Sequence, residues 1–177
     1  NLNTARNEIA SAGTQTAGLA FGGTPAAGLT EQYNGSAWTE VADMNTARSD
    51  FPGTGATNTA ALAFGGASPI VALTETWNGS AWTELNDLNT ARRGLRGMSV
   101  DNTAGLATGG YITTNQSLTE AWNGTSWFEV NDLNTARRYL GVSGTQSEGL
   151  AFGGNAGSNT TVTESWNGSQ WTETNDM

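Results

Sequence analysis

The sequence predicts an all-β protein made of four copies of one unit, and two observations carry this prediction. The phrase Asn-Thr-Ala-Arg occurs four times, at spacings of 42 to 45 residues. Each copy continues in the same order with Gly-Gly, Thr-Glu, an aromatic residue, Asn-Gly and a tryptophan. A fixed period of this length is typical of solenoids and propeller blades. We expect a single repeat domain over residues 1–177, with units at about 3–44, 45–88, 89–133 and 134–177.

Four strands are expected in each unit, as the first unit illustrates. Short segments of small and apolar residues at 9–12 and 17–21 flank a run of turn-forming residues and predict two strands. Segments 29–33 and 36–41 flank Asn34-Gly35 and predict a hairpin with a two-residue turn, because Asn-Gly tolerates the positive φ that this turn needs. Four strands in about 44 residues is the content of one propeller blade. No segment shows helical periodicity.

The two-residue turn also predicts which side chains share a face of a blade. It pairs Tyr33 with Ser36 and Glu31 with Trp38, and alternation then puts Glu31, Tyr33, Trp38 and Glu40 on one side. The other side carries mostly small residues. We expect the aromatic side of one unit to pack on the small side of the next, which buries both glutamates between blades. The tryptophans expected at these positions are Trp38, Trp82, Trp127 and Trp171.

An arginine and a glutamate also recur once in every unit. One interpretation is a ring of charges that binds a ligand. The other is a structural pair within each blade, because a carboxylate on a covered face needs a partner, and residues repeated in every unit are those that the fold requires. We favour the structural pair. The arginines are Arg6, Arg48, Arg92 and Arg137, and the glutamates are Glu31, Glu75, Glu120 and Glu164.

Composition excludes several function classes. The 16 acidic residues outnumber 7 arginines, lysine is absent, and the net charge of -9 argues against nucleic-acid binding and against a polybasic membrane anchor. No apolar run has the length of about 18 to 20 residues that crosses a bilayer. The chain has no cysteine and no histidine, which removes thiolate sites and the commonest general base and metal ligand. We therefore expect no enzymatic activity, no cofactor and no metal. The start at Asn1 favours a processed form or an excerpt.

Arginine at the start of a strand, Gly-Gly at the end of the next, and Glu-x-aromatic followed by tryptophan together resemble the kelch repeat. The resemblance covers all four units and implies a propeller of the galactose-oxidase-like superfamily, with four-stranded blades whose first strand lies nearest the axis. A copper centre of the galactose-oxidase type would require histidine and a cysteine-linked tyrosine, so the resemblance implies a non-catalytic member. The style of the units also resembles arrays in phage and environmental sequences, which favours an extracellular or virion-surface location.

Four units leave three arrangements open, since kelch propellers commonly have six or seven blades. The chain forms a closed four-blade ring, or two chains pair into an eight-blade ring, or the chain belongs to a longer array. The last two are favoured, because uncovered strand edges and aromatic faces are association sites. A homodimer or a longer blade array is the partner arrangement that this predicts.

The segments where the copies differ are the candidate binding site. They lie just after each arginine and between Gly-Gly and Thr-Glu, at 24–29, 67–73, 111–118 and 155–162, and an up-and-down blade brings both kinds of segment to one end of the propeller. Their side chains suit a glycan, a carboxylate or a protein loop. We expect a recognition module for a protein or glycan. Neutral drift of exposed loops, or a structural role in an extracellular or virion particle, is the alternative. The candidate ligand-binding residues are Phe51, Arg93, Arg96, Tyr111, Asn115, Arg138 and Tyr139.

Two further residue sets have simpler explanations than the sites they resemble. Six positions match the N-glycosylation pattern, but turn geometry accounts for the four in Asn-Gly pairs; the six are Asn34, Asn78, Asn115, Asn123, Asn159 and Asn167. Four single aspartates follow the hairpins, without the density of a calcium loop; they are Asp43, Asp87, Asp132 and Asp176.

Overall fold

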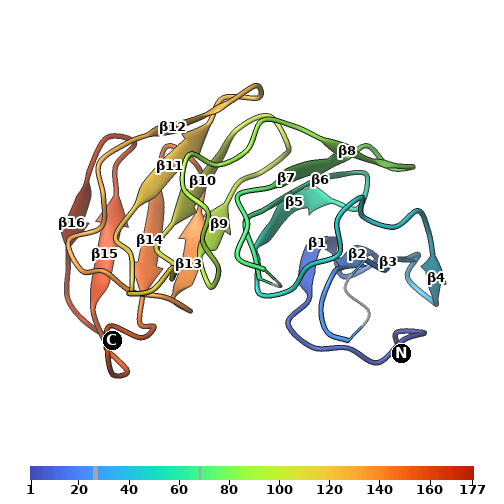
Figure 1. Ribbon diagram of the computed structural model, residues 1–177, viewed down its shortest axis with the longest axis horizontal. Coiled ribbons are helices and arrows are strands. Elements are labelled where there is room, and N and C mark those ends of the chain that lie inside the picture. Colours follow the sequence, from blue (N-terminus) through green and yellow to red (C-terminus); the bar gives the residue numbers. More distant parts are fainter. Residues whose placement is uncertain (26–27, 68) are drawn as a thin grey trace.

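The computed structural model describes residues 1–25, 28–67 and 69–177, and its sixteen strands form four antiparallel sheets of four (Figure 1). The all-β prediction is confirmed, with one sheet in each repeat unit. The first two sheets comprise β1 (Ala10–Thr14), β2 (Ala17–Phe21), β3 (Thr30–Tyr33), β4 (Trp38–Glu40), β5 (Gly53–Thr57), β6 (Ala60–Phe64), β7 (Thr74–Trp77) and β8 (Trp82–Glu84). The other two comprise β9 (Arg96–Met98), β10 (Gly105–Thr108), β11 (Thr119–Trp122), β12 (Trp127–Glu129), β13 (Gly141–Gly144), β14 (Gly149–Phe152), β15 (Thr163–Trp166) and β16 (Trp171–Glu173).

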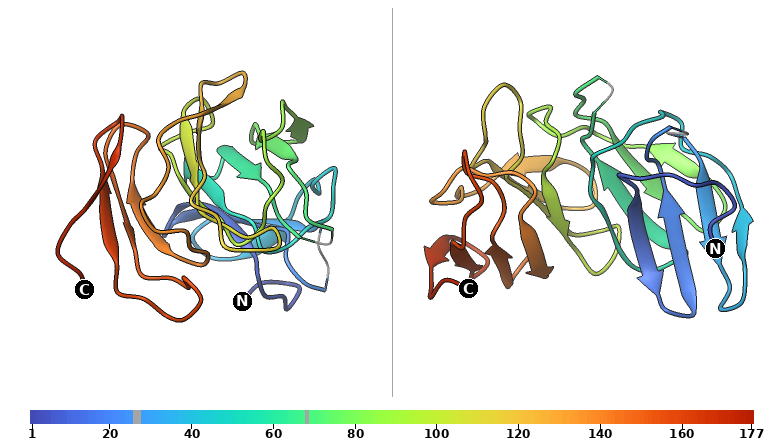
Figure 2. Two further views of the ribbon diagram at one scale, coloured as in Figure 1. Left: turned by 60° about the vertical axis from the view of Figure 1, so that its left-hand side comes forward. Right: turned by 90° about the horizontal axis from the view of Figure 1, so that it is seen from below.

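The four sheets are blades arranged as an arc around a common axis (Figures 1 and 2). Strands β1, β5, β9 and β13 lie innermost, and each contacts the inner strand of the neighbouring blade. The arc is open between β1 and β13, which face each other across the gap in Figure 1. The predicted four-blade propeller of four-stranded blades is therefore confirmed, and of the three arrangements considered, the closed four-blade ring is the one that the chain does not form. No helix in the described part of the chain is long and apolar enough to cross a membrane.

The hairpin between the third and fourth strands of each blade differs from the prediction. Tyr33 pairs with Trp38 rather than with Ser36, so four residues, not two, form the loop. The side-chain oxygen of Asn34 accepts the backbone N–H groups of Ser36 at 2.9 Å and of Ala37 at 3.0 Å. The asparagine thus stabilises the turn through its side chain. Because the register differs by two residues, the predicted sharing of faces is unchanged.

The hydrophobic core is divided among the contacts between neighbouring blades, which we call junctions. Three buried clusters correspond to the three junctions, and each combines the aromatic side of one blade with the small side of the blade before it. In the first junction the ring of Trp82 lies 4.8 Å from Phe21, and its indole N–H donates to the Thr30 hydroxyl at 2.9 Å. The predicted packing of aromatic on small faces is confirmed for Trp82, Trp127 and Trp171, which are buried. Trp38, on the uncovered face of the first blade, is only half-buried.

The repeated arginine and glutamate form one buried ion pair in each blade, as predicted. Arg6 and Glu31 are 2.9 Å apart, and Arg137 and Glu164 are 3.0 Å apart; the other pairs are Arg48 with Glu75 and Arg92 with Glu120. The asparagine of the same phrase completes each pair. In the second unit the amide of Asn45 donates to Glu75 at 3.0 Å and to the Trp82 carbonyl at 3.1 Å. Hydrogen bonds to both oxygens compensate the burial of the carboxylate.

The second glutamate of each hairpin does not follow the prediction. Glu84 lies opposite Glu75 in the strand register, but it is exposed rather than buried between blades, as are its equivalents Glu40, Glu129 and Glu173. These positions lie on the outermost strands, beyond the edge of the neighbouring blade. Their charges stay in water and need no partner.

The Gly-Gly pair allows the next unit to approach the backbone closely. Gly109 and Gly110 both have positive φ, at 66° and 118°. A Cβ atom on Gly109 would lie 2.6 Å from the Arg137 carbonyl oxygen, and the Gly110 N–H donates to that oxygen at 2.9 Å. Only glycine fits a positive φ at such a close contact.

Candidate ligand-binding site at the mouth of the axis

The second residue after each repeated arginine lies at one end of the propeller axis, and we call these four the rim residues: Glu8, Asp50, Gly94 and Tyr139. All four have positive φ, between 53° and 61°. A chain of backbone hydrogen bonds links them from blade to blade, from Asp50 to Glu8 at 3.4 Å, Gly94 to Asp50 at 3.0 Å and Tyr139 to Gly94 at 2.9 Å. Left-handed conformation is uncommon for residues other than glycine and often marks functional sites.

Both kinds of variable segment meet at this end, as predicted. Isolated bridges join Asn7 to Thr24, Ser49 to Ala67, Arg93 to Tyr111 and Arg138 to Asn155, so each segment after an arginine lies beside the segment after Gly-Gly. Residues 26, 27 and 68 of the predicted variable segments 24–29 and 67–73 lie outside the described residues.

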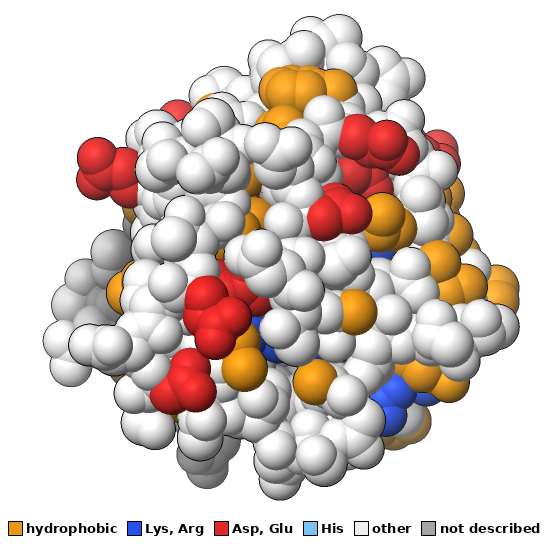
Figure 3. All heavy atoms as spheres, turned by 90° about the vertical axis from the view of Figure 1, so that its left-hand side faces the viewer, with side chains coloured by type: hydrophobic (Ala, Val, Ile, Leu, Met, Phe, Trp, Pro, Cys, Tyr) orange, Lys and Arg blue, Asp and Glu red, His pale blue; other side chains and the backbone are white. Residues whose placement is uncertain are grey.

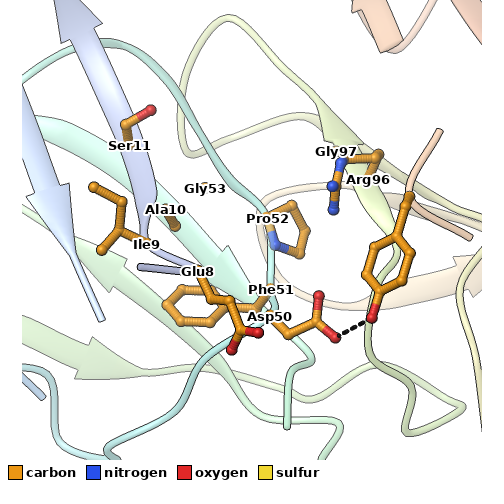
Figure 4. Close-up of a pocket in the computed structure, with 11 residues that line it drawn as sticks. Glu8, Ile9, Ala10, Ser11, Asp50, Phe51, Pro52, Gly53, Arg96 and Gly97 are labelled. Atoms are coloured by element: carbon orange, nitrogen blue, oxygen red, sulfur yellow. Dashed lines mark hydrogen bonds between the residues drawn. The ribbon is translucent and has the colours of Figure 1, made fainter. Parts of the chain in front are cut away.

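A cavity of about 440 Å³ opens beside the rim and is lined by all four blades. Figure 4 shows Glu8, Ile9 and Ser11 of the first blade on one side, Asp50 and Pro52 of the second in the middle, and Arg96 of the third on the other side. Its lining includes acidic, basic, hydroxyl, apolar and aromatic side chains. The volume lies within the range of small-molecule sites.

Asp50 is the carboxylate at the centre of the site. It accepts a hydrogen bond from the Tyr139 hydroxyl at 3.1 Å, drawn dashed in Figure 4, and pairs with the guanidinium of Arg93 at 3.3 Å. Burial raises the pKa of Asp50 above its usual value, against the opposing effects of Tyr139 and Arg93. Burial likewise raises the pKa of Tyr139, and the negative charge of Asp50 adds to this shift. The hydrogen bond between Asp50 and Tyr139 joins the second blade to the fourth.

Arginines and tyrosines alternate along the mouth in a row that we call the Arg–Tyr ladder. The guanidinium of Arg93 lies 5.3 Å from the centre of the Tyr111 ring, and that of Arg138 lies 4.5 Å from Tyr111 and 5.6 Å from Tyr139. The guanidinium of Arg96 lies 5.9 Å from Tyr139. The order is Arg93, Tyr111, Arg138, Tyr139 and Arg96. These distances are those of cation–π contacts, in which the ring attracts the positive charge.

Positive charge is concentrated at this mouth. Four of the seven arginines are bound in the buried Arg–Glu pairs, and the other three, Arg93, Arg96 and Arg138, are in the ladder. Arg96 donates to the Leu95 carbonyl at 2.9 Å, and burial lowers its pKa. On the side of the molecule presented in Figure 3, acidic side chains are scattered among uncharged polar and hydrophobic ones, and small areas of arginine also reach the surface. The mouth thus combines the three arginines outside the buried pairs with the carboxylates of Glu8 and Asp50.

The structure brings together five of the seven predicted ligand-binding residues, which are those of the ladder. Phe51 lines the cavity but is only 4% exposed, because its ring packs 6.0 Å from Phe21 in the first junction, so it does not belong to the ladder. Asn115 lies beside Tyr111 and, like Arg93, Tyr111 and Arg138, outside the cavity lining. Its amide donates to the Asn155 carbonyl at 2.9 Å, which links the loops of the third and fourth blades.

The sequence did not indicate Asp50 as a ligand-binding residue, although Asp50 lies in a segment that differs among the copies. The only signal available was its place two residues after the arginine, where the four copies have glutamate, aspartate, glycine and tyrosine. A single aspartate in a loop resembles a turn residue. Its hydrogen bond to Tyr139, 89 residues away, is visible only in three dimensions.

The four aspartates after the hairpins serve the backbone. Each accepts the N–H of the threonine that begins the third strand of its own blade, as Asp132 does from Thr119 at 2.9 Å. Within the described ranges, no group of three acidic side chains is close enough to hold a metal ion. The asparagines of the four Asn-Gly pairs likewise use their side-chain oxygens within their own turns.

Comparison with known proteins supports the fold. No protein-family model matches the sequence, and no curated protein sequence matches it. One solved structure, described as the structure of YjhT, superposes with a TM-score of 0.80 over 99% of this chain and 67% of that chain, at 12% sequence identity. At such low identity the similarity concerns the fold alone. This chain has a β-propeller-type fold.

Proposed function

We propose that this protein is a non-catalytic, kelch-like propeller module that binds a glycan at the mouth of its axis. The observation that carries the proposal is the Arg–Tyr ladder beside a cavity of about 440 Å³. Asp50, Arg96 and Tyr139 line this cavity, and the ladder continues from Tyr139 through Arg138 and Tyr111 to Arg93. Binding sites on repeat scaffolds are usually built from such divergent segments.

The chemistry of the lining favours a glycan over a protein. A sugar presents hydroxyl groups that both donate and accept, and the site offers donors in Arg96 and Tyr139 and acceptors in Asp50 and Glu8. The exposed part of the Tyr139 ring provides a flat surface for the apolar face of a sugar. A cavity of this size suits one or two sugar rings, whereas a stable protein partner covers about 800 Å² of surface.

Two contacts support a binding role for Asp50. It pairs with the guanidinium of Arg93 and accepts a hydrogen bond from the Tyr139 hydroxyl. These contacts hold the carboxylate in place as an acceptor. The kelch-like part of the proposal is supported by the arginine, Gly-Gly, glutamate and tryptophan, which have equivalent places in all four blades.

Glycan-array screening followed by calorimetry tests the proposal. We expect binding to a defined set of glycans and a loss of affinity of about tenfold or more in Arg96→Gln, which keeps a polar side chain of similar length but removes the charge. Glu84→Gln, a change on the exposed outer strand of the second blade, is the matched control and should bind as the wild type does. Absence of glycan binding by the wild-type protein, or equal affinity in Arg96→Gln, would contradict the proposal. Selection of a peptide instead of a glycan would assign the mouth to a protein loop.

A further inference from the structure

All three junctions between blades use the same set of three hydrogen bonds. The tryptophan indole of the following blade donates to a threonine hydroxyl of the preceding blade, at 2.9, 2.9 and 3.1 Å. The second glycine of Gly-Gly donates its N–H to the arginine carbonyl of the following blade, at 3.0, 3.0 and 2.9 Å. The rim residue of the following blade donates its N–H to the preceding rim carbonyl, at 3.4, 3.0 and 2.9 Å. These bonds define which surface fits the next blade.

The two free faces of the arc carry the complementary halves of this set. By equivalence with the junctions, the groups of the first blade are the Trp38 indole N–H, the Arg6 carbonyl and the Glu8 N–H, and those of the fourth are the Thr163 hydroxyl, the Gly154 N–H and the Tyr139 carbonyl. Among the described residues, no protein group bonds to these atoms in the way their equivalents bond at the junctions. Every donor on one face therefore has its acceptor on the other.

The apolar parts of the two free faces are also uncovered. Leu150 on the fourth blade is 42% exposed, whereas its equivalents Leu19, Leu62 and Leu106 are at most 1% exposed beneath the blade that follows. Phe152 is half-buried, although the equivalent Phe21 and Phe64 are buried completely. On the first blade Tyr33 and Trp38 are half-buried, whereas the corresponding aromatic pairs of the other blades are buried. Covering such side chains is favourable by about 25 cal/mol per Å².

We propose that the aromatic face of the first blade binds the small face of the fourth blade of a second copy of this chain, head to tail. The occupant is a second copy because its fourth blade carries Leu150, Phe152 and Thr163 in the places that the three internal junctions already use. The contact is heterologous: one copy contributes its first-blade face and the other its fourth-blade face. Each copy therefore keeps one face free for a further contact. Two copies that close form an eight-blade ring, and copies that do not close form a growing chain. This inference does not depend on the glycan.

Mass measurement across a range of concentrations, by light scattering and sedimentation, tests the inference. The wild-type protein is expected to form dimers or larger species as its concentration rises. Each copy has a net charge of -9, and salt screens the repulsion between copies, with a Debye length of about 10 Å at 0.1 M, so association is expected to strengthen with salt. A wild-type protein that stays monomeric throughout overturns the inference.

Two face variants separate head-to-tail binding from other associations. Leu150→Asp places a charge on the free face of the fourth blade, and Trp38→Ser removes the indole from the free face of the first. Each variant alone should be monomeric, and a mixture of the two should form a one-to-one dimer through the intact faces. Val100→Asp, a charge at an exposed apolar residue outside both faces, is the matched control and should associate as the wild type does.

Failure of two folded variants to form the mixed dimer overturns head-to-tail binding, as does self-association of Leu150→Asp. The latter would indicate contact between two aromatic faces. Leu150 is exposed, so its substitution keeps the test interpretable even if Trp38→Ser does not fold.

Discussion

The Tyr139 hydroxyl donates a hydrogen bond to the Asp50 carboxylate at 3.1 Å, and the two residues are 89 positions apart in the chain. They belong to the fourth and second blades, and Arg93 of the third blade also reaches Asp50, at 3.3 Å. Three blades therefore meet at one carboxylate. The positions of these side chains depend on the packing of every junction between them, so the site exists only when the arc is assembled.

Substitutions of Tyr139 should separate its ring from its hydroxyl. Tyr139→Phe keeps the ring for the guanidinium groups of Arg96 and Arg138 and loses the hydrogen bond, so we expect a stability loss below about 1 kcal/mol because the side chain is 44% exposed. Tyr139→Ala removes the ring as well and should lower the proposed glycan affinity by about tenfold, or about 1.4 kcal/mol. Thermal unfolding and calorimetry measure the two effects. Equal affinities in the two variants would show that the ring does not contribute.

Removing the charge of one buried ion pair should be strongly destabilising. Glu75→Gln leaves the buried guanidinium of Arg48 without a counter-charge, and the loss of one partner of such a pair costs about 3 to 5 kcal/mol. Glu84→Gln is the same substitution on the directly opposite, exposed residue and should change the free energy of unfolding by less than about 0.5 kcal/mol. Urea unfolding of both variants provides the measurement. Similar small losses in the two would mean that the ion pair contributes little.

The repeated residues could be predicted from the sequence because each performs the same task in every blade. The Arg6–Glu31 pairing follows from the cost of an unpaired charge on a covered face, and that reasoning needs no coordinates. The predicted length of the turn at Asn34 was wrong, because Asn-Gly fits both a two-residue turn and a longer loop that the asparagine side chain stabilises. Alternation has a period of two, so this error did not change the predicted faces.

The candidate site was predictable only in part, because it is made by contacts between blades. That Arg93, Arg138 and Tyr139 lie at one end followed from strand direction alone. The burial of Phe51 did not, because it depends on the ring of Phe21 in the neighbouring blade. Nor did the role of Asp50, whose partners come from two other blades. A single unit of the repeat contains no information on these distances.

The indole–hydroxyl bond at a junction should have a measurable coupling energy. Trp127 donates to Thr74 at 2.9 Å within the second junction. In a double-mutant cycle of Trp127→Phe and Thr74→Val, we expect a coupling of about 0.5 to 1.5 kcal/mol, as for a buried neutral hydrogen bond. Trp38→Phe is the matched control, because its indole has no described threonine partner, and it should cost less than Trp127→Phe in dilute protein. Urea unfolding gives the four free energies of the cycle, and additive effects would contradict the role of this bond.

The pH dependence of stability should identify Asp50 as a carboxylate that folding makes harder to ionise. Its pKa is raised above the ordinary 3.8 chiefly by burial, so the folded state binds the proton more tightly than the unfolded state. The contribution of Asp50 to stability is then greatest below its unfolded pKa and is lost as the pH rises through its folded pKa. Asp50→Asn does not titrate, so the free energy of unfolding of the variant minus that of the wild type should increase with pH across this interval and become constant above it. Urea unfolding at a series of pH values measures this difference, in which the contributions of the other carboxylates largely cancel. A difference that instead decreases with pH would show that the contacts with Arg93 and Tyr139 outweigh burial and that the pKa of Asp50 is lowered.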